Sequence, residues 1–223
     1  EEFLQDYFLP CLHANCVYEG RYLLGTSIAR PLISKHHVRI AHEHGANTVC
    51  HGATGKGNDQ VRFELGYQAL DADLEILAPW KNTDFIEQFA AGRKTMLDYC
   101  EKHGLEAKAS RSKPWSSDDN LLHISYEAGV LEDPWVTAPD EIFERMVHPT
   151  QAPDEVERFI IHWSQGVPVK VSSCSTKPGK FEDIDIEIAE PADTLAEGLL
   201  SVFEYVDEAA ARNGVGSLGM VET

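Results

Sequence analysis

The stretch NTVCHGATGKGNDQVRFE, residues 47–64, decides the fold of this chain. Its first four residues form a short β-prone run, and the residues after Gly57 mix apolar and polar side chains in a pattern that favours a helix. The glycines between them therefore lie at a turn from a strand into a helix. Because glycine lets a backbone approach a ligand closely and a helix start favours negative charge, this turn suits a nucleotide phosphate or a carboxylate.

The glycine run matches neither of the two common nucleotide-binding motifs. A Walker loop has four residues between its glycines and a Ser or Thr after its Lys, whereas Gly52 and Gly55 enclose two residues and Gly57 follows Lys56. The Rossmann motif needs a third glycine where Gln60 stands. The run is a motif of its own, and a glycine-rich surface turn before a capped helix stays open as the alternative.

The composition indicates a soluble globular protein that handles small substrates. The chain has 223 residues, 43% of them hydrophobic, which is enough for a sizeable core in one large domain or two small ones. It carries 19 Lys and Arg against 37 Asp and Glu, a formal net charge of −18, which disfavours binding to nucleic acid or to an anionic membrane surface. An acidic chain can still bind anions through local amides and a few cations.

The sequence also predicts a cytoplasmic protein with reduced thiols. No segment approaches the roughly 18 consecutive apolar residues of a membrane-spanning helix, and the acidic first residues do not resemble a signal peptide. The five cysteines are an odd number without a C-x-x-C pair, which argues against a disulfide framework or a zinc site. No metal site is predicted, because His42 and His44 stand two residues apart on an expected helix and face different directions.

The first half of the chain alternates helices with strands, which predicts a parallel sheet of the α/β class. The second helix is expected to start at a cap on Thr26 or Ser27, to hold Pro31 in its first turn and to end at Gly45. The expected elements are a helix near 1–16, a helix up to 45, a strand at 47–50, the helix after the glycine run, a strand at 74–78, and helices at 84–90 and 92–102.

The pattern changes after Gly104, where we expect a boundary between a domain of residues 1–104 and a domain of residues 105–223. The second part shows strand patterns, a hairpin turn at Gln165 and Gly166, and one clear amphipathic helix. The expected elements are a strand at 121–127, an irregular connection at 128–154, hairpin strands at 159–162 and 167–171, a long loop at 172–179, an alternating run at Ile184, Ile186 and Ile188, and a helix at 192–212.

Three runs of the sequence carry a resemblance to a known family. They are YEGRYLLGTSIARP at 18–31, the glycine motif at 51–64, and PWSSDDNLLHISYEAG at 114–129. Together they closely resemble the argininosuccinate synthase family, and the likeness extends over nearly the whole chain. The resemblance implies a partial parallel-sheet nucleotide-binding domain of the adenine nucleotide alpha-hydrolase-like type, followed by the start of an α+β synthetase and multimerisation domain.

The resemblance implies an ATP-dependent carbon–nitrogen ligase of arginine biosynthesis or the urea cycle. In that reaction the ureido oxygen of citrulline attacks the α-phosphorus of ATP and releases pyrophosphate, and the amine of aspartate then displaces AMP to give argininosuccinate. The resemblance further implies ATP as a substrate with Mg²⁺, and a homotetramer. The net charge of −18 argues against nucleic-acid and membrane partners. No residue is assigned as a catalytic acid or base, since positioning and charge stabilisation suffice for phosphoryl chemistry.

The motifs also imply which side chains bind each substrate. Gly52 would lie against the nucleotide, with Lys56 as a further candidate phosphate contact. Asn58 and Arg62 stand four residues apart and would share a helix face; Arg62 suits a carboxylate, and Asp59 suits an α-ammonium. The implied aspartate site is Thr54, Asn58 and Asp59, and the implied citrulline site is Tyr22, Ser27, Asn58, Arg62, Ser116, Ser125 and Glu222.

The sequence departs from the family pattern at both ends. The Ser-Gly-Gly-Leu-Asp-Thr-Ser loop that wraps the pyrophosphate end of ATP does not occur, and the family's Lys-Ser-Arg-Gly segment and long assembly helix do not follow Thr223. The chain resembles an internal fragment, so we expect no turnover from these 223 residues alone, and a non-catalytic ligand-binding or interface fragment is the alternative.

Some of the implied site residues have an ordinary structural alternative when the resemblance is set aside. Ser27 could then be only a helix cap, Tyr22 a half-buried aromatic, and Ser125 a solvent-facing strand residue. Glu222 could be a solvated acid near the chain end.

Overall fold

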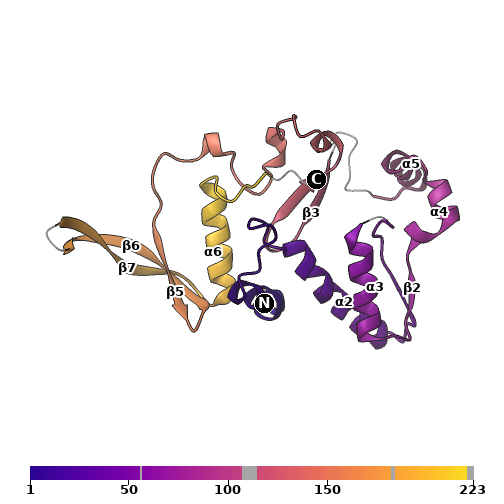
Figure 1. The fold of residues 1–223 in the computed structure, drawn as a ribbon, viewed down its shortest axis with the longest axis horizontal. Coiled ribbons are helices and arrows are strands. Elements are labelled where there is room, and N and C mark those ends of the chain that lie inside the picture. The colour runs from indigo at the N-terminus through magenta and orange to yellow at the C-terminus, as the bar shows by residue number, and fades with distance from the viewer. Residues whose placement is uncertain (56, 107–114, 182–183, 220–223) are drawn as a thin grey trace. The chain divides into compact units, whose positions relative to one another are not determined.

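A computed structural model describes residues 1–55, 57–106, 115–181 and 184–219 of the chain (Figure 1). Contacts divide the chain into two compact units. The continuous unit is Tyr22–Thr137, and the split unit joins Glu1–Arg21 to Ala138–Thr223. This division is not a test of the domain boundary near Gly104, which stays a prediction.

The continuous unit contains two short parallel strands, each preceded by a helix. Helix α2, Gly25–Glu43, leads into strand β1, Thr48–Cys50, and helix α3, Asn58–Leu70, leads into strand β2, Glu75–Leu77. The two strands pair in parallel, with Val49 opposite Ile76. This parallel pair and the alternation of helices with strands confirm the predicted α/β class.

The core of the continuous unit lies where α2 and α3 pack side by side (Figure 1). Val38 and Ala41 of α2 bury themselves against Val49 of β1 and Tyr67 of α3. The Tyr67 side chain is fully buried, and its hydroxyl satisfies its polar end with a 2.9 Å hydrogen bond to Nδ1 of His37 on α2. The same packed helix pair positions the polar residues described below.

Short helices and an antiparallel strand pair complete the continuous unit. The Asn82 side chain caps helix α4 by accepting the Phe85 N–H, and Gly104 ends α5 in the left-handed conformation that glycine tolerates best. The elements are η2, Pro79–Lys81; α4, Thr83–Gln88; α5, Arg93–His103; β3, Ser116–Asp119; β4, Ile124–Glu127; and η3, Gly129–Glu132.

Strand β3 is absent from the sequence prediction, although its partner β4 is part of it. All four residues of β3 are polar, so they show none of the apolar alternation from which strands are predicted. The strand exists because it pairs antiparallel with β4, which sets Asp118 opposite Ser125. Long-range pairing has therefore decided the structure of this segment.

The predicted start of α2 is wrong. The helix begins at Gly25, its N-cap is Leu24 with φ of 60°, and no side chain caps it, so neither Thr26 nor Ser27 is the cap. The His123 ring packs closely over Gly25, because an added Cβ would lie 2.5 Å from its Nε2. Pro31 consequently stands inside the helix rather than in its first turn, and it withholds a backbone N–H from the Ser27 carbonyl.

The split unit packs a three-stranded antiparallel sheet and a long helix against the first residues of the chain. The ring of Phe8 packs edge-on against Phe203 with ring centroids 5.7 Å apart, and Phe159 packs against Tyr205 in the same way. The elements are the π-helix η1, Phe3–Phe8; α1, Leu9–His13; η4, Asp140–Ile142; η5, Pro149–Gln151; β5, Phe159–Ser164; β6, Val167–Phe181; β7, Ile184–Glu197; and α6, Leu199–Arg212.

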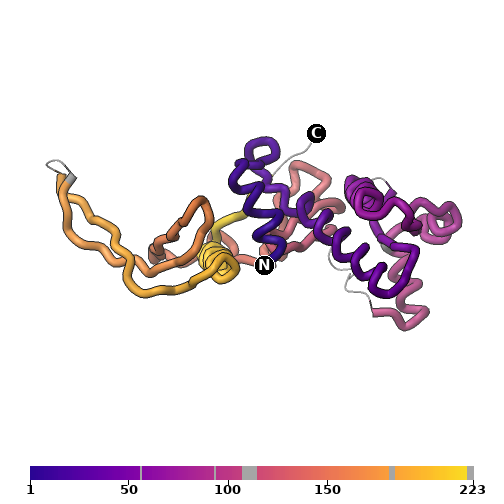
Figure 2. Tube along the Cα trace, turned by 90° about the horizontal axis from the view of Figure 1, so that it is seen from below, coloured from indigo at the N-terminus to yellow at the C-terminus, as the bar shows by residue number. Residues whose placement is uncertain are grey.

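The hairpin prediction at Gln165 and Gly166 is confirmed, because both residues have positive φ in the turn between β5 and β6. Two neighbouring predictions are wrong. Residues 172–179 form part of β6 rather than a loop, and residues 192–197 form part of β7 rather than the start of a helix. Figure 2 shows these two long strands side by side, and their mutual pairing keeps polar segments extended.

The connection at 128–154 is irregular apart from three short 3₁₀ helices, as predicted. Within the described ranges, no helix is both long and apolar enough to cross a membrane.

Candidate functional site

The glycine run connects β1 to α3 as the sequence predicts. Gly57 precedes the helix in extended conformation, its N–H lies 3.4 Å from the Thr54 carbonyl, and the helix begins at Asn58. A Cβ on Gly55 would lie 3.1 Å from the Trp80 carbonyl oxygen, so the segments that follow β1 and β2 approach each other closely. The space beside Gly52 is open, because a Cβ there would meet no atom within 4 Å.

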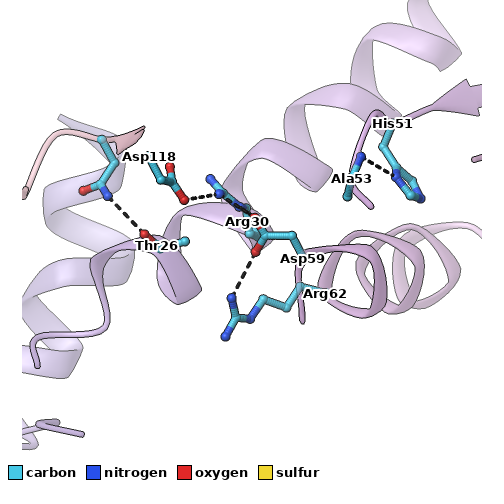
Figure 3. Close-up of polar contacts among 8 residues, drawn as sticks. Thr26, Arg30, His51, Ala53, Asp59, Arg62 and Asp118 are labelled. Atoms are coloured by element: carbon cyan, nitrogen blue, oxygen red, sulfur yellow. Dashed lines mark hydrogen bonds and ion pairs between the residues drawn. The ribbon is translucent and has the colours of Figure 1, made fainter. Parts of the chain in front are cut away.

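The His51 side chain holds the first part of this turn in place. Its side chain is only 3% exposed, and it stacks on Phe63 with ring centroids 5.8 Å apart. Nδ1 accepts the N–H of Ala53 at 3.3 Å (Figure 3), so the ring proton is on Nε2. Nε2 lies 3.4 Å from a carboxylate oxygen of Glu64. The imidazole therefore links the backbone of the turn to helix α3.

Asp59 lies between two arginines at the start of α3. Arg30 donates to Oδ2 from Nε at 2.9 Å and from Nη2 at 2.6 Å, and Arg62 donates to Oδ1 from Nη1 at 3.0 Å (Figure 3). Partial burial by itself raises the pKa of Asp59, but the hydrogen bonds and charges of Arg30 and Arg62 outweigh it. The net pKa is lower than that of an ordinary aspartate, so this carboxylate is charged at neutral pH.

Arg30 extends the network to the β3–β4 pair. Its Nη2 also lies 2.5 Å from Oδ2 of Asp118, and its guanidinium stands 5.7 Å from the centre of the Phe63 ring. Burial by itself lowers the pKa of Arg30, yet the two carboxylates more than compensate and the net pKa is raised. Two cations and two anions therefore form a neutral cluster, which we call the arginine–aspartate network: Arg30, Asp59, Arg62 and Asp118.

The helix start of α2 is joined to the turn between β3 and β4. The Asn120 amide lies 3.5 Å from the Thr26 hydroxyl, and the ring of Tyr22 packs edge-on against His123 with centroids 5.3 Å apart. Asn120 also shapes the turn, because its side-chain oxygen accepts the N–H groups of Leu122 and His123. These contacts bring two of the three resembling runs, 18–31 and 114–129, together in space.

The predicted site residues that the structure describes all belong to the continuous unit. Asp59 and Arg62 are hydrogen-bonded to each other directly. Thr54 lies on the adjoining turn, and Asn58 is the first residue of α3. Ser27 lies on α2, and Ser116 and Ser125 lie on the paired strands β3 and β4; within the described residues, Ser27 and Ser125 are not bonded to Asp59 or Arg62. Lys56 and Glu222 lie outside the described residues.

The sequence prediction assigned no role to Arg30 or Asp118, although both stand inside the quoted runs. Local spacing gave no signal for Arg30, because residues one and two positions apart on a helix face different directions and Arg30 therefore does not share the face of Ile28 and Leu32. Asp118 carried no signal either, because its strand is polar throughout.

The arrangement can bind a zwitterionic ligand. Arg62 keeps further N–H donors beyond the one on Asp59, and its side chain is 34% exposed, so it can hold a carboxylate. The donor set does not fit a metal ion held by protein side chains, because Asp59 and Asp118 are neutralised by arginines. No group of three or more metal-ligating side chains occurs in the part of the chain that the structure describes.

Comparison with known proteins relates the chain to one family along its length. A model described as the arginosuccinate synthase N-terminal HUP domain matches residues 1–106, and one described as the arginosuccinate synthase C-terminal domain matches residues 115–223. Argininosuccinate synthase of Thermotoga petrophila is 46% identical over 221 residues, which are 99% of this chain and 50% of that protein.

Two eukaryotic proteins agree with that match. Argininosuccinate synthase of Schizosaccharomyces pombe is 44% identical over 222 residues, covering 100% of this chain and 50% of that protein. The protein of the same name from Gallus gallus is 42% identical over 221 residues, covering 99% of this chain and 49% of that protein. The chain spans about half the length of the curated relatives it matches.

Proposed function

The chain belongs to the argininosuccinate synthase family, and from this premise we propose that the protein carrying it is an ATP-dependent ligase that joins citrulline to aspartate. The matched N-terminal HUP domain agrees with the predicted adenine nucleotide alpha-hydrolase-like fold. We assign to the product, argininosuccinate, a place in arginine biosynthesis.

The proposed reaction has two steps that balance without a covalent protein intermediate. The ureido oxygen of citrulline forms a bond to the α-phosphorus of ATP while the bond to pyrophosphate breaks. The aspartate amine then bonds to the ureido carbon, loses a proton, and expels AMP with the former ureido oxygen. Magnesium would accompany the nucleotide phosphates, which supply the oxygen ligands that the protein network does not offer.

The observation that carries the proposal is the pre-formed charge pattern at the start of α3. Arg62 has N–H donors beyond the one bonded to Asp59, and these would hold the carboxylate of citrulline. Asp59 uses Oδ2 for Arg30 but accepts a single bond at Oδ1, so a lone pair remains for the ammonium group of aspartate. Thr54 and Asn58 would complete the aspartate site, and Asn58 would also reach citrulline.

The remaining assignments are proposed on the motifs and on local structure. Gly52 would lie against the nucleotide, which the open space beside it supports. The citrulline site would include Tyr22 and Ser27 at the start of α2, and Ser116 and Ser125 on the paired strands. Glu222 is retained from the resemblance.

Four further features of the protein are proposals of the same kind. A domain boundary near Gly104 is supported by family models whose matches end at residue 106 and begin at residue 115. A homotetramer and a cytoplasmic location are proposed from the resemblance. The absence of nucleic-acid and membrane partners is proposed from the net charge of −18.

The test is a labelling experiment on the protein at the full length of its relatives. Citrulline carrying ¹⁸O in the ureido group is incubated with ATP, Mg²⁺ and aspartate, and the AMP is analysed by mass spectrometry. We expect one ¹⁸O atom in each AMP and pyrophosphate release that requires citrulline. Unlabelled AMP, or pyrophosphate release independent of citrulline, would overturn the mechanism.

A binding experiment on the 223 residues tests the proposed citrulline site apart from turnover. Citrulline binding, measured by titration calorimetry, would show that the isolated chain holds this site, whereas the labelling experiment separates the ligase from the alternative of a non-catalytic fragment. Arg62→Gln should abolish that binding, whereas the matched control Arg39→Gln should not, because Arg39 pairs with Glu43 on the exposed face of α2.

A further inference from the structure

Arg30 is placed where an arginine is costly unless it has a definite task. It stands on α2, its side chain is 13% exposed, and it bonds carboxylates from two other elements. A single carboxylate would neutralise it, yet Nη2 lies within 2.6 Å of Asp59 and 2.5 Å of Asp118. A partly buried arginine that bonds two anions from different elements joins those elements to each other, which an ion pair on the surface does not do.

The geometry around Arg30 leaves Asp59 little freedom. Nε and Nη2 both donate to the same oxygen of Asp59, Oδ2, so the carboxylate is held from one side. The Phe63 ring lies under the guanidinium, four residues after Asp59 on α3. With Oδ2 occupied, the other oxygen, Oδ1, is turned to Arg62.

The charges of the arginine–aspartate network give this arrangement an electrostatic consequence. Arg30 and Arg62 contribute two positive charges, and Asp59 and Asp118 contribute two negative ones, so the network is neutral. Without Arg30 it would carry a net charge of −1, and Arg62 would be the sole cation facing two carboxylates. A substrate carboxylate approaching Arg62 would then meet repulsion in place of a neutral network.

We propose that Arg30 is a positioning residue of the substrate site: it fixes the Asp59 carboxylate and neutralises it, so that Arg62 remains available for a substrate carboxylate. Asp118 is the second anchor of Arg30 and joins strand β3, which carries Ser116, to the same network. The kinetic part of this inference rests on the proposed ligase function, whereas its electrostatic part does not.

The kinetic experiment uses the full-length protein and three variants of the network with one control. Arg30→Lys keeps the positive charge but loses the planar guanidinium that donates two N–H groups to Asp59. The KM values for aspartate and citrulline should each rise about tenfold. Arg30→Gln removes the charge as well and should raise them roughly 30-fold. The KM for ATP should stay within about threefold. Arg39→Gln, an exposed arginine on the same helix, should match the wild type in all three.

The decisive variant is Arg30→Gln combined with Asp118→Asn. This pair restores a neutral network of Asp59 and Arg62, so the amino-acid KM values should fall back to within about tenfold of the wild type. A residue that only fills space would gain nothing from removing the Asp118 charge. Amino-acid KM values in Arg30→Lys equal to those of Arg39→Gln, or no recovery in the double variant, would overturn the proposal.

A measurement independent of turnover separates this inference from the proposed function. The Asp59 carboxyl carbon is titrated by ¹³C NMR in the wild type and in Arg30→Lys, with melting temperatures recorded to show that both are folded. We expect the pKa of Asp59 to rise in the variant. An unchanged pKa would overturn the inference even for an active ligase, whereas a raised pKa in a protein without turnover would support it and reject the function alone.

Discussion

Replacing Gly66 with alanine should force helices α2 and α3 apart. Gly66 lies on α3, seven residues after Asp59, and an added Cβ would lie 2.7 Å from the Oγ and 2.9 Å from the Cβ of Ser34. Ser34 is fully buried on α2, four residues after Arg30. Because the Ser34 Cβ is bonded directly to the backbone, rotation of the side chain cannot remove the clash.

The size of the effect follows from two opposing contributions. Alanine improves helix propensity over glycine by about 1 kcal/mol. Overpacking a close helix contact costs about 1–3 kcal/mol, and two contacts below 3.0 Å with a rigid neighbour place this site in the upper half of that range. We therefore expect Gly66→Ala to lower the free energy of unfolding by roughly 1–2 kcal/mol.

Urea unfolding followed by circular dichroism measures this change. With a slope of about 2 kcal/mol per molar urea, the midpoint should fall by roughly 0.5–1 M at an unchanged slope. The matched control is Gly66→Ala in a Ser34→Gly background, where the clash is gone and the substitution should be neutral or stabilising. A Gly66→Ala protein at least as stable as the wild type would refute the packing argument.

Three further predictions concern the site itself. Gly25→Ala places a Cβ 2.5 Å from Nε2 of His123, and the His123 ring packs on Tyr22. Steady-state kinetics should therefore show a several-fold higher KM for citrulline and an unchanged KM for ATP. A citrulline KM equal to that of the wild type would contradict the role of Tyr22. His51→Phe keeps the stacking on Phe63 but removes the acceptor for the Ala53 N–H. Its free energy of unfolding, measured with urea, should fall by about 1–2 kcal/mol. His51→Asn should lose less, because its side-chain oxygen can accept that hydrogen bond. The pKa of Asp59 is lower in the folded than in the unfolded chain, so its ion pairs stabilise the protein fully above the unfolded pKa, and this stabilisation is lost as pH falls through the folded pKa. The difference in melting temperature between the wild type and Asp59→Asn should therefore shrink below about pH 4. A difference that stays constant with pH would count against the ion pairs.

Local sequence patterns were sufficient for the elements around the glycine run. Strands β1 and β2, the start of α3 at Asn58 and the end of α5 at Gly104 follow from short-range signals such as β-prone residues and capping glycines. The same patterns failed for the polar strand β3 and for residues 172–179 and 192–197, which are extended because a partner strand pairs with them. The polar composition of these segments does not indicate that a partner strand pairs with them.

The candidate site divides in the same way. Motif and spacing were enough to predict that Asn58, Asp59 and Arg62 begin one helix and that Asn58 and Arg62, four residues apart, share a face of it. They could not predict that Arg30 and Asp118 complete the network, because these residues are 29 and 59 positions away from Asp59 in the chain.

The sequence alone determined the strand–turn–helix unit at residues 47–64, its class and the family to which the chain belongs, because those depend on residue types at short spacing. Only the tertiary structure decided which charges compensate one another and how closely α2 approaches α3. Ion pairing and side-chain contact depend on distances of a few ångströms in space, and the packing of Gly66 against Ser34 brings residues together that the chain keeps far apart.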